Sequence, residues 1–155
     1  MATERWIAGN GVGLTWTDAF STATLNSIAN GNAIASGVVI NNATALDMFC
    51  DLSIALASGA FAAPAFVGVY FYALNHDGTS YGDGRFGSSA AGPPPSTYLQ
   101  GIIGLVAATQ AQTGMLRGII LPPGSGKFVL MNRGGIAFAA SGNTCQYRTY
   151  NRQVT

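Results

Sequence analysis

The chain has 155 residues, of which 48% are hydrophobic and only 8% are charged, and its formal net charge is +1. This composition excludes intrinsic disorder, which goes with low hydrophobicity and high charge. It also speaks against a nucleic-acid-binding protein, which needs a dense Lys/Arg surface. One compact domain is expected. Because free proteins normally use surface charge to stay apart, we expect much of this charge-poor surface to be covered by further copies of the chain or by a partner.

The few charges divide along the chain. Residues 1–84 hold all six acidic residues and one base, a balance of −5, whereas residues 85–155 hold six bases and no acid, a balance of +6. Two interpretations stay open at this point. Either the two halves pair within one fold, or a negative face of one subunit meets a positive face of the next and sets their register.

In chain order, the first predicted element is an N-terminal arm or extension over residues 1–32, which is rich in Gly and Asn and carries Trp6 and Trp16 as isolated large side chains. Asp18 is predicted to cap a short helix that ends at Asn30. The apolar side chains of this helix are Phe20, Leu25 and Ile28. A charged pair followed by glycines is not typical of a secretion signal, so none is expected.

Residues 33–155 are predicted to form a single β-sandwich domain. Its clearest strand is Leu46–Ala57, in which apolar residues alternate with smaller or polar ones at a period of two. One face holds Leu46, Met48, Cys50, Leu52, Ile54 and Leu56, and the other holds Asp47, Phe49, Asp51, Ser53, Ala55 and Ala57. The first face predicts core contacts, and the second predicts a contact surface.

The segment Leu52–Leu74 carries no charge over its 23 residues, which is the length of a membrane-spanning helix. However, Gly59, Pro64 and Gly68 interrupt it, and β-branched and aromatic residues dominate its second half. This pattern predicts two strands joined by a turn, and no association with a membrane.

Further strands are predicted along the rest of the chain, separated by turns rich in Gly and Pro. They are Phe66–Leu74, Tyr98–Ala107, Met115–Leu121, Phe128–Asn132, Ile136–Ala140 and Thr144–Tyr150. The last three are expected to form a meander. A long loop over residues 75–97 is expected to be functional, for example as an arm that reaches a neighbour. The predicted fold class is all-β: an antiparallel β-sandwich, jelly-roll-like, with an irregular N-terminal segment.

The chain offers no set of side chains typical of an enzyme, so a non-enzymatic protein is predicted. Gly82–Gly87 matches GxGxxG by letter but lacks the preceding strand and following helix of a dinucleotide site. His76 is the single histidine, and no GxSxG sequence occurs. Asp47 and Asp51 would lie about 13 Å apart on one strand face, too far for a glycosidase pair. No catalytic, cofactor-binding or metal-binding residues are assigned, whereas calcium or glycan binding by the loop at 75–97 stays open.

Cys50 and Cys145 are the two cysteines of the chain. They belong to no CxxC or Cys/His cluster of the kind that holds zinc. Two free thiols that pack as small apolar groups are the default expectation. A disulfide between them across a sheet stays open.

Several stretches resemble small virion structural proteins of tailed bacteriophages, and within that group the jelly-roll cement, or decoration, proteins of the capsid. The stretches are TLNSIANGNAIASG, LDMFCDLSIALAS, YGDG and LRGIILPPGSGKFVLMNRGGIAFAASGNTCQYRTYN, and the resemblance covers the chain from about Thr24 to its C-terminus. It implies a homo-oligomeric protein on the capsid surface of the virion, assembled in the host cytoplasm, whose partner is the major capsid protein. It implies no catalytic residues and no cofactor.

Aromatic and arginine side chains are the usual anchors of protein interfaces. The residues expected to anchor this one are Trp6, Trp16, Arg85, Phe86, Arg148 and Arg152. The alternative hypothesis is a carbohydrate-binding jelly-roll module of a phage head or tail fibre. Such a module would need a concave patch of exposed Tyr or Trp side chains with Asp or Asn nearby.

Overall fold

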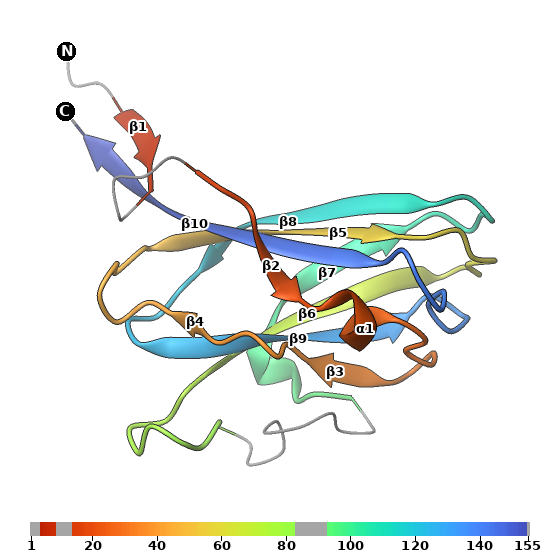
Figure 1. Ribbon diagram of the computed structural model, residues 1–155, viewed down its shortest axis with the longest axis horizontal. Helices are drawn as coiled ribbons and strands as arrows, with labels where there is room; N and C mark the ends of the chain where they lie inside the picture. The colour runs from red at the N-terminus through yellow and green to blue at the C-terminus, as the bar shows by residue number, and fades with distance from the viewer. Residues whose placement is uncertain (1–3, 9–13, 83–92, 155) are drawn as a thin grey trace.

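The computed structural model of the chain describes residues 4–8, 14–82 and 93–154. In this part, ten strands form two antiparallel sheets that pack face to face, which confirms the predicted all-β antiparallel sandwich (Figure 1). The first sheet consists of β1 (Glu4–Ile7), β2 (Thr17–Phe20), β5 (Phe49–Leu56), β8 (Gln112–Ile120) and β10 (Thr144–Val154). The second consists of β3 (Ala33–Ala35), β4 (Ile40–Asn41), β6 (Ala65–Ala73), β7 (Leu99–Leu105) and β9 (Ser125–Arg133).

The chain crosses repeatedly between the two sheets. The first sheet has the spatial order β1-β10-β5-β8, with β2 also paired to β10, and the second has the order β3-β9-β6-β7, with β4 also paired to β9. From β4 onward, consecutive strands lie in opposite sheets, except for β6 and β7. This order is compatible with a jelly roll.

Strand β5 shows how the alternating sequence builds the core. Cys50, Leu52 and Ile54 are fully buried between the sheets, where they belong to one cluster with Val67 and Phe128 of the second sheet. The intervening β5 residues face outward, because successive strand side chains point to opposite faces. The uncharged stretch after β5 continues into β6, so the predicted pair of strands is confirmed. No helix within the described residues is long and apolar enough to cross a membrane.

Strand β5 begins at Phe49 and not at Leu46 as predicted. Leu46 adopts a positive φ of 49°, and the buried Asn42 side chain bonds both the backbone N–H and the C=O of Asp47. The N–H of Met48 donates to Asn151 Oδ1 at 2.8 Å. These backbone groups of Asp47 and Met48 bond to side chains and so do not take part in a strand ladder. Leu46 and Met48 consequently lie outside the predicted core face and are exposed.

The predicted N-terminal helix is much shorter and has a different cap. Helix α1 spans only Thr22–Leu25, and the Ser21 hydroxyl accepts from the N–H of Thr24 at 3.2 Å. The predicted cap, Asp18, lies in β2 and accepts from the Gln146 amide at 2.9 Å. The three apolar side chains predicted for this helix are buried, although only one belongs to α1; they are Phe20, Leu25 and Ile28.

Two predictions near the C-terminus are wrong. The segment 136–140 is not a strand, because the buried Asn132 amide donates to the carbonyls of Ile28 and Ile136, each at 2.8 Å, and holds the chain in an irregular path. The expected meander is absent as well, since β9 and β10 lie in opposite sheets. The segment 134–143 between β9 and β10 therefore connects the two sheets and does not form a hairpin between neighbouring strands.

The long loop after β6 lies over the outer face of the second sheet at both of its described ends. At one end Tyr81 packs beneath the Lys127 ammonium, which lies 4.3 Å from the ring centroid. At the other end Tyr98 stacks on Tyr72 with ring centroids 4.2 Å apart. A second apolar cluster therefore forms outside the sandwich core, between the sheet and this loop.

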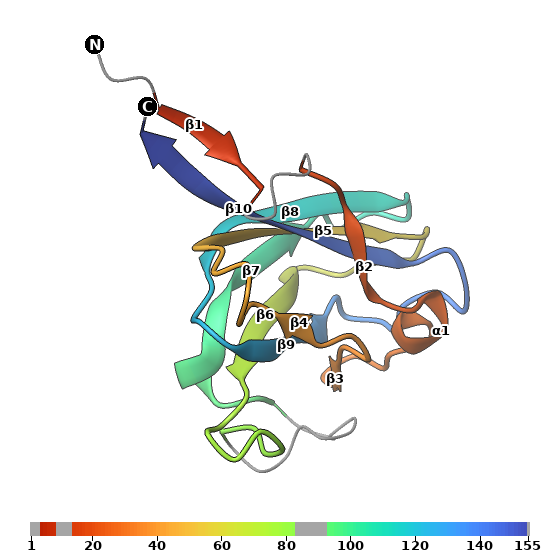
Figure 2. The same cartoon turned by 60° about the vertical axis from the view of Figure 1, so that its left-hand side comes forward.

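The first and last strands form a ribbon that leaves the body of the sandwich. Strand β1 pairs with the final residues of β10, from Glu4 opposite Val154 to Ile7 opposite Asn151. The first residue of β5, Phe49, lies opposite Tyr150, so the part of β10 that pairs with β1 extends past β5. Figures 1 and 2 both show the two strands projecting together, with the start of β1 and the end of β10 at the tip.

Candidate functional site

Charged and aromatic side chains from β1, β5 and β10 lie together on the outer face of the first sheet. Arg148 lies opposite Asp51 and Tyr150 lies opposite Phe49 in the β10–β5 ladder. Further along β10, Arg152 lies opposite Trp6 of β1. Because alternate residues of a strand share a face and directly opposed residues point the same way, all of these side chains project to the same outer surface.

Asp51 is the centre of this face. Strand β8 carries one residue more than β5 at this position, so that Arg117 and Gly118 both face Asp51. Gly118 has a positive φ of 68°, which is typical of a bulge built on glycine. The bulge turns the N–H of Gly118 toward Asp51 Oδ1, at 3.1 Å.

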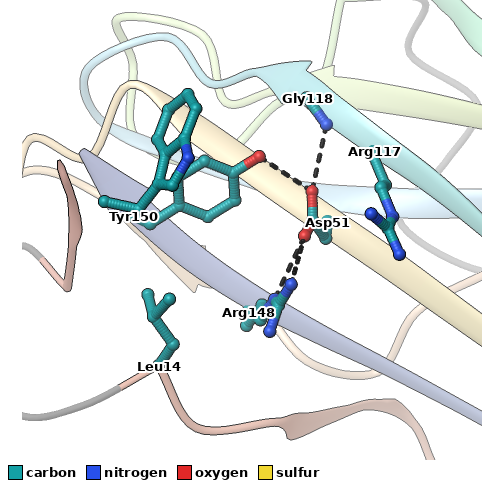
Figure 3. A pocket seen from close by; sticks show the side chains of 7 residues that line it. Leu14, Asp51, Arg117, Gly118, Arg148 and Tyr150 are labelled. Carbon is teal, nitrogen blue, oxygen red and sulfur yellow. Dashed lines mark hydrogen bonds and ion pairs between the residues drawn. The ribbon is translucent and has the colours of Figure 1, made fainter. Parts of the chain in front are cut away.

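Four hydrogen bonds in total converge on the Asp51 carboxylate (Figure 3). Arg148 donates from Nε and Nη2 to Oδ2, at 3.1 and 2.8 Å. The Tyr150 hydroxyl donates to Oδ1 at 2.8 Å. Together with the Gly118 N–H, these donors occupy both carboxylate oxygens, so Asp51 has little capacity left for an external ligand.

The surroundings of Asp51 determine its charge state. Burial raises the pKa of its carboxyl, but the hydrogen bonds from Arg148, Tyr150 and Gly118 and the charge of Arg148 outweigh burial and bring the pKa below the ordinary 3.8. Burial, the hydrogen bond to Asp51 and the charge of Asp51 raise the pKa of Tyr150 to about 12. At neutral pH the site therefore contains an ionised Asp51 and a protonated Tyr150.

A pocket of about 410 Å³ opens beside this network. Figure 3 shows Leu14 across the pocket from Asp51 and Arg117 beside it. Its lining residues are Trp6, Leu14, Asp51, Arg117, Gly118, Arg148 and Tyr150. The pocket thus combines apolar walls with two guanidinium groups; among the described residues, that of Arg148 is paired with a carboxylate and that of Arg117 is not.

Aromatic rings continue from the pocket along the ribbon. The Trp6 ring meets Tyr150 edge-on at 5.3 Å and Phe49 edge-on at 6.0 Å. Trp6 nevertheless remains 57% exposed. A second tryptophan contacts the pocket residue Arg148: its guanidinium lies 4.7 Å from the Trp16 ring centroid, a cation–π contact.

Exposed aliphatic side chains extend this aromatic group at the end of the sheet where β5 begins and β8 ends. Ile120 pairs with Phe49 in the ladder and is 71% exposed. Leu46 and Met48, just before β5, are also exposed. We call these three residues, together with Trp6 and Phe49, the apolar end of the first sheet. Large apolar side chains exposed close together in this way are a common mark of an interaction site.

The structure brings together four of the six residues predicted as interface anchors. Trp6, Trp16, Arg148 and Arg152 all lie on or beside β10. The other two, Arg85 and Phe86, lie outside the described residues. Sequence reasoning did not assign Asp51, Tyr150 or Arg117 to this site, although the outward parity of Asp51 with Phe49 was visible in the sequence.

One ion pair joins the acidic and the basic half of the chain within the fold, between Asp51 and Arg148 at 2.8 Å. Asp18 and Asp47 instead accept hydrogen bonds from side-chain amides, those of Gln146 and Asn151. The pair between Asp51 and Arg148 therefore links the two halves at the pocket, whereas Arg117 beside it is exposed and forms no ion pair with a described acid.

The cysteines and Asp77, which the sequence also offered as candidates, make contacts within the fold and do not belong to this site. Cys50 and Cys145 are buried free thiols, so the disulfide left open by the sequence is not formed. Asp77 Oδ1 accepts from the N–H groups of Thr79 and Ser80 within its own turn. In the described part of the chain, no three His, Cys, Asp or Glu side chains form a group that could hold a metal ion.

No protein-family model matches the chain, and no curated protein matches its sequence significantly.

Proposed function

We propose that the chain is a non-enzymatic structural protein of a tailed-phage virion, which binds the major capsid protein on the capsid surface and stabilises the assembled shell. The observation that carries this proposal is the exposed Trp6, which belongs to the apolar end of the first sheet and lies on a ribbon that projects from the sandwich (Figure 2). Tryptophan and arginine dominate the energetics of protein interfaces. Trp6 is accompanied by Arg152 on the ribbon and by Arg148 in the pocket.

The stabilising mechanism is thermodynamic. A protein that binds the assembled shell and not its separated subunits shifts the equilibrium toward the shell by mass action. The ribbon suits this role, because two strands alone are marginally stable in water and gain stability when a partner covers their apolar side. The antiparallel sandwich behind it provides a rigid base.

The alternative, a carbohydrate-binding module, draws support from the aromatic walls of the pocket, Trp6 and Tyr150. A sugar, however, presents both hydroxyl donors and acceptors, and the one carboxylate of the pocket already accepts four hydrogen bonds. This favours a protein partner. Saturable binding of the free protein on a glycan array, lost on Trp6→Ala, would reverse the preference.

The first test is composition. Particles purified from infected cells should contain this chain in near-stoichiometric ratio to the shell protein, as measured by quantitative mass spectrometry. Its absence from such particles would refute the proposal directly, since a cement protein must be present on the shell that it stabilises.

The second test locates the interface with two matched variants. Trp6→Ala should weaken binding to particles that lack the chain by about 30-fold, the effect of losing an interface hot spot of about 2 kcal/mol. Ile102→Ala removes an equally exposed side chain, 58% against 57%, from the second sheet, and should change the affinity by less than about twofold. Equal effects of the two substitutions would place the interface elsewhere.

A further inference from the structure

The pocket on the first sheet offers hydrogen-bond donors with almost no acceptor to match them. Arg117 uses Nε to contact Met115 Sδ at 3.1 Å, and its two terminal nitrogens bond no other described residue. Arg148 uses Nε and Nη2 on Asp51 and keeps Nη1. Both oxygens of Asp51, the acceptor of the pocket, are occupied. A ligand that fits must therefore be an acceptor.

The charge of the pocket is positive by one unit. Arg148 and Asp51 neutralise each other at 2.8 Å, whereas Arg117 lines the same pocket and forms no ion pair with any described acid. One unbalanced guanidinium matches a singly charged acceptor group. A carboxylate satisfies this condition with the planar geometry that guanidinium groups recognise.

The pocket wall across from Arg117 is apolar, so a ligand that fills the pocket needs an apolar group there. Leu14 and the Trp6 ring border the pocket and remain partly exposed, and Trp6 is held edge-on against Tyr150. Burying an apolar side chain against these walls stabilises a complex in proportion to the area removed from water. An inorganic anion would leave the walls exposed.

We propose that this pocket binds a carboxylate that is flanked by an apolar side chain, within a segment of the partner protein, with Arg117 as the ion-pairing residue and Trp6 and Leu14 as the apolar contacts. The partner is the shell protein if the proposed function holds, and to that extent this assignment rests on it. The preference of the pocket for an apolar carboxylate is a property of the isolated protein and is tested without particles.

The test uses two probes that differ in one charge, N-acetylphenylalanine and its neutral amide. Each is titrated into the isotope-labelled full chain while the NMR signals of the Trp6 indole N–H and the Gly118 amide are followed. The acid should shift both signals and bind about fivefold more tightly than the amide, the factor that corresponds to about 1 kcal/mol for an ion pair at a partly exposed site. The indole signal is assigned with Trp6→Phe.

Arg117→Gln should abolish the preference for the acid, whereas Arg117→Lys should retain part of it because the charge remains. Arg133→Gln, which removes an exposed base from the second sheet, should have no effect. Equal affinity for acid and amide, no saturable shift with either, or an undiminished preference in Arg117→Gln would overturn the assignment. Inorganic phosphate that shifts both signals as strongly as the acid would overturn it too, because it would show a general anion site.

The outcomes separate this proposal from the proposed function. If the wild-type chain binds particles but shows no preference between the probes, only the pocket assignment fails. If the preference holds while the chain is absent from purified particles, the pocket stands and the capsid role fails.

Discussion

Asp51 combines a charge with nearly complete burial, and it is stabilised by donors from two neighbouring strands, β8 and β10. A buried carboxylate is costly unless its oxygens are hydrogen-bonded and its charge is balanced. Both conditions hold here, so the network links the three strands β10, β5 and β8 at one point. Removing a single member leaves the others partly unsatisfied.

Asp51→Asn should therefore destabilise the protein strongly. Arg148 would keep its charge in a half-buried place without a counter-ion, and breaking a buried pair in this way costs about 3–5 kcal/mol. We expect the lower end, about 3 kcal/mol, because the Arg148 side chain is 27% exposed. Urea unfolding measures the change. Asp18→Asn, at an exposed acid, is the control and should cost less than about 1 kcal/mol.

The lowered pKa of Asp51 predicts that the stability of the protein depends on pH in the acidic range. The pKa of Asp51 is lower in the folded protein than its ordinary 3.8, so its contribution to stability is present above pH 3.8 and is lost as the pH falls through the folded pKa. The difference in unfolding free energy between wild type and Asp51→Asn should be constant near neutral pH and shrink in this acidic range. A difference that does not change with pH would contradict the assigned network.

The raised pKa of Tyr150 predicts that the stability of the protein depends on pH in the alkaline range. Its pKa rises from 10.0 to about 12 in the fold, so its contribution to stability is complete below pH 10 and is lost as the pH rises toward 12. The stability of Tyr150→Phe relative to wild type should increase over this interval. Ultraviolet absorbance of the tyrosinate should show one tyrosine fewer titrating near pH 12 in the variant than in the wild type.

At the level of elements, the bulge of β8 is what places the site. Gly118 needs its positive φ of 68° to direct an N–H at Asp51, and residues with a Cβ pay about 1–2 kcal/mol in that region. Gly118→Ala should lower the unfolding free energy by this amount. Gly104→Ala in β7, where an added Cβ meets no atom within 4 Å, should be neutral or slightly stabilising. Similar losses at both positions would show that the bulge has no special role.

Secondary structure was predictable where the pattern is local. The alternation that predicts a strand over Leu46–Ala57 is correct from Phe49 onward, because β5 is buried on one face along its whole length. It fails at Leu46, where the Asn42 side chain bonds the backbone five residues ahead. The strand expected at 136–140 fails for the same reason at Asn132. A single buried asparagine overrides a hydrophobic pattern by satisfying the backbone itself.

At the level of the whole molecule, the two cysteines test the packing of the sandwich. Cys50 and Cys145 lie free on its inner face, and burial raises the pKa of both thiols. Because the thiolate is the reactive form, neither should react with iodoacetamide in the native protein, and both should react after unfolding without reductant. Mass spectrometry counts the labels. An introduced exposed thiol, Ser58→Cys, should react in the native state, and failure to label unfolded Cys50 and Cys145 would contradict the free thiols.

The sequence by itself determined the fold class and the inward face of the central strand, because period-two alternation and core burial depend on neighbouring residues. It also identified Trp6, Trp16, Arg148 and Arg152 as unusual side chains on a charge-poor chain. The tertiary structure alone decided that all four lie on or beside β10, and that Trp6 and Arg148 line one pocket there. Asp51 and Arg148 are 97 positions apart and become partners only through the register of β5 and β10, and the donor from Gly118 depends on a bulge in a third strand. The hydrophobic pattern decides which face of each strand is buried, but which residues of distant strands lie opposite each other depends on how the whole sandwich packs.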